Sequence, residues 1–120
     1  MSSIYIASKT KHAAYWRQLR ASGMPIISTW IDEAGEGETE EWGDLWRRCI
    51  LEASSADCLW VYCEGGDTLK GALVEVGAAL AAGVRVIAIG DFPEHSWLRH
   101  PLVTSVFSIF QAQTIMEEPK

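Results

Sequence analysis

One carboxylate stands out by its surroundings: Glu75 lies in a run of apolar and small residues from 69 to 82, directly after a glycine-containing turn at 64–68. An ionised carboxylate among apolar groups is costly to leave without a partner. Glu75 is therefore held either by a structural ion pair or for chemistry. A buried carboxylate in a binding site can act as a nucleophile or stabilise a developing positive charge.

The glycines around this acid point to ligand binding. Gly65, Gly66 and Gly71 let the backbone approach a bound group closely, and the amides that open a helix favour a negatively charged group such as phosphate. Glycine-rich turns between strand and helix are common, so the pattern alone does not name the ligand. It nominates the three glycines as substrate-binding residues.

The elements that must position these residues alternate between strand and helix. Apolar and β-branched runs predict strands at 3–7, 25–29, 57–63, 84–89 and about 103–109. Helical periodicity predicts helices at 11–22, about 39–55 and 69–82, with Thr39 as an N-cap, Gly83 as a stop and a short helical turn near 94–99. Residues 116–120 are expected to fray.

This alternation predicts an α/β fold, a three-layer sandwich with about five parallel strands, in a single domain spanning 1–120. Ligands of such sheets bind outside the carboxyl ends of the strands. The rule nominates three loops, at 8–11, 29–38 and 63–70.

The helix expected at 69–82 has two distinct sides. Leu69, Ala72, Leu73, Val76 and Leu80 form an apolar stripe that we assign to the sheet. The opposite side carries small residues and the acid, at positions 71, 75, 78, 79 and 82. Because a helix that is apolar on nearly all sides is usually covered, a second element or a second subunit should pack there.

Composition and charge narrow the possible partners. The net charge of −6 and the absence of a basic cluster argue against duplex nucleic acid. No apolar run approaches the roughly 20 residues of a membrane span, and the N-terminus has no signal-like segment, so we expect a cytoplasmic protein without membrane contact.

Cysteine and histidine give no metal-binding pattern. Cys49, Cys58 and Cys63 lack the paired spacing of a zinc site and are expected to be reduced apolar residues. The three histidines, among them His12, have no ligand spacing and are interpreted as surface or capping residues. We expect neither a metal nor a cofactor.

Several segments together resemble the nucleoside 2-deoxyribosyltransferase family. They are Ile-Tyr-Ile-Ala at 4–7, Ala-Asp at 56–57, Leu-Val-Glu-Val-Gly-Ala-Ala-Leu-Ala-Ala-Gly at 73–83 and Val-Arg-Val-Ile at 84–87. The glutamate segment with its alanine-rich helix is the most specific of them. The resemblance covers most of residues 3–90. It implies a flavodoxin-like fold, a homodimer or higher homo-oligomer, and cleavage of the N-glycosidic bond of a deoxynucleoside or its monophosphate.

The resemblance also implies residue roles. Glu75 falls on the position of the family's catalytic glutamate, and Asp67 is either an acid that meets the base or an ordinary acid in a glycine turn. Ser8 and Lys9 contact sugar or phosphate, unless they are solvated loop residues. Trp30 stacks on the base or else belongs to the core or an interface.

One position departs from the family. Where its enzymes commonly place an acid, about two turns before the Ala-Asp pair, this chain has Cys49, and a neutral thiol does not reproduce a carboxylate's charge. Three hypotheses therefore stay open: an enzyme that transfers or hydrolyses the glycosyl group, a binding module that retains a nucleotide, and a purely structural subunit.

Overall fold

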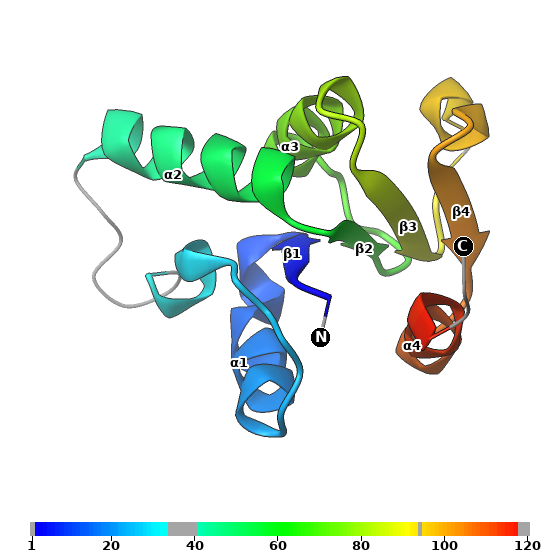
Figure 1. Ribbon diagram of the computed structural model, residues 1–120, viewed down its shortest axis with the longest axis horizontal. Helices are drawn as coiled ribbons and strands as arrows, with labels where there is room; N and C mark the ends of the chain where they lie inside the picture. Colours follow the sequence, from blue (N-terminus) through cyan, green and yellow to red (C-terminus); the bar gives the residue numbers. More distant parts are fainter. Residues whose placement is uncertain (1, 34–40, 94, 118–120) are drawn as a thin grey trace.

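The computed structural model describes residues 2–33, 41–93 and 95–117, and these form a four-stranded parallel sheet. Its strands are β1 (Ile4–Ala7), β2 (Cys58–Cys63), β3 (Arg85–Gly90) and β4 (Val103–Val106), in the order β1-β2-β3-β4. The two central strands are buried on both faces, as their continuous apolar runs predict. The predicted α/β class with a parallel sheet is therefore confirmed (Figure 1).

The prediction of about five strands is wrong by one, because residues 25–29 do not form a strand. They make a single bridge, Ile26 to Ile4, flanked by hydrogen bonds from Ile4 N–H to the Pro25 carbonyl and from Ile27 N–H to the Ile4 carbonyl, each 2.9 Å. Pro25 has no N–H to extend the ladder. The chain then turns into the 3-10 helix η2 (Thr29–Asp32), so only one pair remains of the expected edge strand beside β1.

Helices cover both faces of the sheet. α2 (Trp42–Ser55) and α3 (Gly71–Ala81) lie side by side on one face, and α1 (Ala13–Ala21) and α4 (Ile109–Glu117) lie on the other (Figure 1). Short 3-10 helices precede α1 and β4, η1 at Thr10–His12 and η3 at Ser96–Arg99. The result is the flavodoxin-like three-layer sandwich that was expected. The predicted N-cap Thr39 and the first residue of the predicted turn at 94–99 lie outside the described residues.

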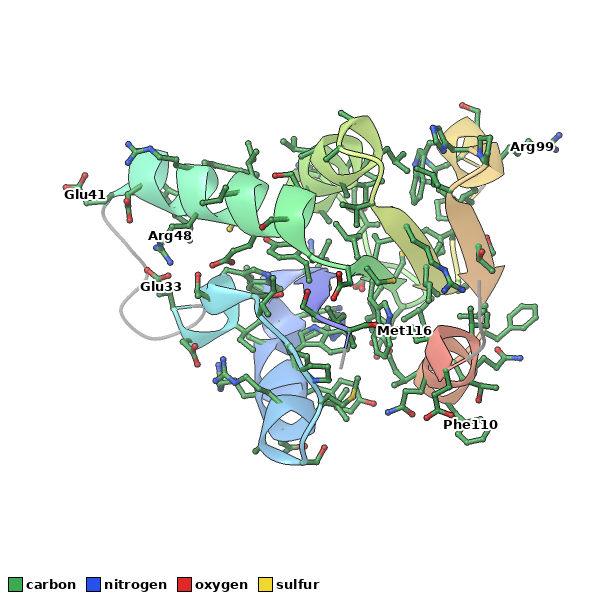
Figure 2. The ribbon with its side chains drawn as sticks, in the orientation of Figure 1. Glu33, Glu41, Arg48, Arg99, Phe110 and Met116 are labelled. Carbon is green, nitrogen blue, oxygen red and sulfur yellow. The ribbon has the colours of Figure 1, made fainter. Side chains whose placement is uncertain are left out.

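The C-terminal segment differs from its prediction. β4 ends at Val106 instead of about residue 109, and α4 spans 109–117, although residue 109 was expected in the strand and residues 116–117 in a frayed tail. Ser108 and Gln111 make a reciprocal cap: the Ser108 hydroxyl accepts the Gln111 N–H at 3.2 Å, and the Gln111 side chain accepts the Phe107 and Ser108 N–H groups. Figure 2 shows Phe110 of α4 pointing away from the sheet. Met116, near the end of the same helix, contacts the sheet: its Sδ accepts a hydrogen bond from Nε1 of Trp60 at 3.1 Å.

The buried side of α3 is rotated from the predicted one. The buried residues are Ala72, Glu75, Val76 and Ala79, so Glu75 lies on the packed stripe instead of opposite the sheet. Because α2 covers one flank of α3, this stripe faces both the sheet and α2. The second element expected against the small residues is thus α2 of the same chain: its Trp46 ring would be 3.0 Å from a Cβ at Gly71.

In the part of the chain that the structure describes, no helix is both long and apolar enough to cross a membrane.

Candidate functional site

A cavity of about 320 Å³ opens beside the carboxyl end of β1, between the loop that follows this strand, η2, α2 and the start of α3. This is the edge at which ligands of parallel sheets bind. The volume lies in the range of small-molecule sites. The lining residues come from four segments: Ser8, Lys9 and Thr10; Trp30; Trp42, Leu45, Trp46 and Cys49; and Thr68, Leu69, Lys70, Gly71, Ala72 and Glu75.

Glu75 is the acid of this cavity, the single Asp or Glu among the described residues that line it. It lies one turn into α3 and is 7% exposed. The phenol of Tyr5, on β1, donates a hydrogen bond to its Oε2. One face of the carboxylate is thus held by the sheet, while the residue still borders the cavity.

Burial changes the acidity of Glu75. Loss of water raises the pKa of its carboxyl to about 7, even though the hydrogen bond from Tyr5 lowers it. Burial also raises the pKa of Tyr5 far above its ordinary value, so the phenol keeps its proton and acts as the donor. Glu75 therefore changes charge close to neutral pH.

Cys49 lies in the same buried cluster. It is 5% exposed, borders the cavity and interacts with both Tyr5 and Glu75. Burial raises the pKa of its thiol to about 11, so the thiol is neutral at physiological pH. All three cysteines are free and buried, which confirms the prediction of reduced apolar residues.

Three of the predicted substrate-binding side chains are brought to the cavity. Trp30 is 7% exposed and donates from Nε1 to the Ile6 carbonyl at 2.7 Å, so its ring is a fixed part of the wall. The Ser8 hydroxyl accepts from Trp16 Nε1 at 2.9 Å. Lys9 lies at the mouth. Gly71 also lines the cavity, packed against Trp46 of α2.

The other predicted site residues lie elsewhere. Gly65 and Gly66 are exposed in the turn after β2 and do not line the cavity. The Asp67 side chain is fully buried, also outside the cavity lining, and its carboxylate is bound by Lys11 and His12. His12 is therefore shielded, with its side chain 11% exposed; of the two interpretations above, the structure favours the capping position, since His12 is the N-cap residue of α1, although its side chain makes no cap hydrogen bond.

Sequence reasoning missed Tyr5, Trp42, Trp46 and Lys70 as residues of the site. Tyr5 carried a usable signal, because a tyrosine inside a fully apolar strand needs a hydrogen-bond partner for its hydroxyl. Trp42 and Trp46 lie in the helix expected at about 39–55 and were not nominated for the site, yet they are 57% and 37% exposed and border the cavity.

No group of three or more histidine, cysteine, aspartate or glutamate side chains is arranged to hold a metal ion within residues 2–33, 41–93 and 95–117.

A parallel sheet with helices on both faces defines a flavodoxin-like α/β protein, and here a buried acid borders a cavity at the carboxyl edge of the sheet. Among solved structures, the chain is similar to the CMP N-glycosidase BcmB of Clostridium botulinum, with a TM-score of 0.63 and 13% sequence identity over 95% of this chain and 98% of that one. No protein-family model and no curated protein sequence matches the chain. At this identity the likeness establishes the shared fold.

Proposed function

We propose that the protein cleaves the N-glycosidic bond of a nucleoside monophosphate or its deoxy counterpart, with Glu75 acting on the anomeric carbon. The observation that carries the proposal is a buried carboxylate that borders a cavity at the ligand-binding edge of the sheet and is held there by Tyr5. The similar fold of a CMP N-glycosidase supports the same class of reaction. So does the resemblance of residues 73–83 to the deoxyribosyltransferase segment.

The reaction requires that the nucleobase departs from C1′ of the sugar and that the positive charge developing on C1′ is stabilised. The bond between C1′ and the base nitrogen breaks, its electron pair goes to the base, and the base takes up a proton. The ionised Glu75 carboxylate bonds to C1′ or stabilises its oxocarbenium character from one face. Water then adds to C1′, any bond between Glu75 and C1′ breaks with its electron pair returning to the carboxylate, and the added water loses a proton, which gives the free sugar phosphate and replaces the proton that the base took up. Transfer to a second base would replace the water.

The charge around the cavity favours a phosphorylated substrate. Lys9 and Lys70 border it together with Thr68 and the first residue of α3, Gly71, at the opening helix end. Amides at a helix N-terminus and ammonium groups both attract phosphate. Glu75 lies one turn deeper along α3. A phosphate at the opening end would therefore direct the sugar towards the acid.

The test is base release from CMP, dCMP and the matching nucleosides, followed by chromatography. The wild type should release base from a monophosphate faster than from the nucleoside, and Glu75→Gln should lose at least roughly a hundredfold in kcat/KM. Glu117→Gln, the same change at an exposed helix end, is the control. Undiminished release by Glu75→Gln would remove Glu75 from the chemistry.

Cys49 favours a second candidate, a module that binds a nucleotide without cleaving it. Its neutral thiol borders the cavity where the resembled family has an acid. Such a module would bind CMP or dCMP in calorimetry with no base released over hours. Rapid base release by the wild type excludes it.

We further propose that the chain forms a homodimer through α2 and α3. Apolar side chains on these helices remain exposed: Trp42 at 57%, which borders the cavity, and Leu51 at 65% and Val74 at 51%, which do not. A second copy that covered Leu51 and Val74 would bury exposed apolar surface.

A further inference from the structure

The Asp67 carboxylate joins two segments that are far apart in sequence. Its Oδ1 lies 2.8 Å from Lys11 Nζ, and its Oδ2 lies 2.9 Å from His12 Nε2 and accepts the Glu64 N–H at 3.1 Å. Since an ionised carboxylate only accepts hydrogen bonds, Nε2 of His12 carries the shared proton. The contact therefore connects the loop after β1 with the loop after β2.

Both loops supply walls of the cavity. Residues 8–10 border it from the first loop, and Lys11 and His12 follow them directly. Residues 68–70 border it from the second loop, and Asp67 precedes them directly. The bonds to Asp67 thus join the segments that directly adjoin the two walls in sequence.

The two partners of Asp67 do not contribute equally. The Lys11 side chain is 57% exposed, and ion pairs of such exposed groups are weak. His12 is shielded and also packs edge-on against Tyr62, with ring centroids 5.1 Å apart. Tyr62 in turn packs against Trp16, whose Nε1 donates to Ser8 of the cavity wall. His12 is therefore the main partner of Asp67.

We propose that Asp67 is a positioning residue, which clamps the loops at 8–12 and 64–70 together through His12 and so holds the cavity at its working width. This role replaces direct contact with the base. The kinetic arm of its test rests on the proposed function, whereas the exchange arm does not.

Hydrogen exchange followed by mass spectrometry tests the clamp in the free protein. Asp67→Asn should speed amide exchange in both loops by roughly tenfold, with the rest of the chain unchanged. His12→Phe keeps the ring packing on Tyr62 but removes the N–H, and it should give the same pattern. Asp32→Asn breaks the ion pair with Arg20 away from the cavity and is the matched control. Unchanged exchange in the 8–12 loop of both variants overturns the clamp.

Kinetics with CMP or dCMP separates positioning from acid catalysis. A clamp predicts a KM raised by roughly tenfold in Asp67→Asn, a similar rise in His12→Phe, and no further rise in the double variant. A fall in kcat in Asp67→Asn that His12→Phe does not reproduce overturns the clamp and marks Asp67 as a proton donor. If the wild type cleaves no nucleotide, the proposed function fails, and the exchange result alone decides the clamp.

Discussion

The phenol of Tyr5 donates a hydrogen bond to the carboxylate of Glu75, joining β1 to α3 across 70 positions of the sequence. Both side chains are buried, at 0% and 7% exposure. The bond favours the ionised form of the acid, whereas burial opposes it, and the balance leaves the pKa of Glu75 at about 7. The charge of this carboxylate thus depends first on its burial and then on the hydrogen bond from Tyr5, which opposes the effect of burial.

Tyr5→Phe removes this donor. Because the hydrogen bond lowers the pKa of Glu75, its loss should raise that pKa further above 7. At pH 7 less of the carboxylate is ionised, and kcat/KM should fall by roughly tenfold or more, with partial recovery at higher pH. The pH profile of base release measures this shift. Tyr15→Phe, on the exposed side of α1, should leave the profile unchanged.

Glu75→Gln should stabilise the protein at alkaline pH. Burial raises the pKa of Glu75 from 4.5 to about 7, so the folded state holds a proton that the unfolded state has lost across this interval. Stability of the wild type therefore falls as pH rises through it, by about 3 kcal/mol in total. Glutamine carries no such penalty. Urea unfolding should show the variant gaining over the wild type much more at pH 8 than at pH 5, which lies near the lower end of this interval, and an equal difference at both would contradict the assigned shift.

Cys49→Asp places a second acid beside Glu75. The like charge should raise the pKa of Glu75 and move the midpoint of the pH–rate profile upwards. Two buried carboxylates should also cost about 2–4 kcal/mol of stability at pH 8, and less at pH 5, where Glu75 is protonated. Cys49→Ser, with no new charge, serves as the control in the same unfolding experiment. A profile that did not move would place the two side chains in separate environments.

Two glycines of α3 should respond in opposite directions to alanine. No described atom lies within 4 Å of a Cβ built on Gly77, so Gly77→Ala should stabilise the helix by about 0.5–1 kcal/mol. A Cβ on Gly71 would lie 3.0 Å from the Trp46 ring, so Gly71→Ala should displace that ring and cost about 1 kcal/mol. Thermal unfolding compares the two variants. Only Gly71→Ala should also weaken nucleotide binding, because Trp46 borders the cavity.

Leu51→Glu tests the proposed homodimer. Leu51 is 65% exposed on α2, and a charge there should prevent a second copy from packing on this face. Light scattering after size exclusion should then give a dimer for the wild type and a monomer for the variant. Phe110→Glu, at a residue that is 74% exposed on α4 across the sheet, should remain dimeric (Figure 2). A monomeric wild type at micromolar concentrations would refute this interface.

Much of the architecture could be predicted because its signals are local. The apolar runs of β2 and β3 and the periodicity of α2 and α3 depend on neighbouring residues, and they identified both the sheet and the edge where the cavity lies. The failed strand at 25–29 shows the limit of such signals. Its composition suits a strand, but Pro25 and the following turn leave it one bridge.

Within the candidate site, the sequence by itself singled out Glu75, because a lone acid in an apolar helix is visible without coordinates. The sequence also nominated four other residues that line the cavity: Ser8, Lys9, Trp30 and Gly71. Only the tertiary structure decided which groups face this acid and which turn away. Tyr5 meets it because α3 is rotated towards β1, and Asp67 points to His12 because two loops converge behind the wall. Such pairings depend on the rotation of a helix and the approach of distant segments, which no local pattern of residues encodes.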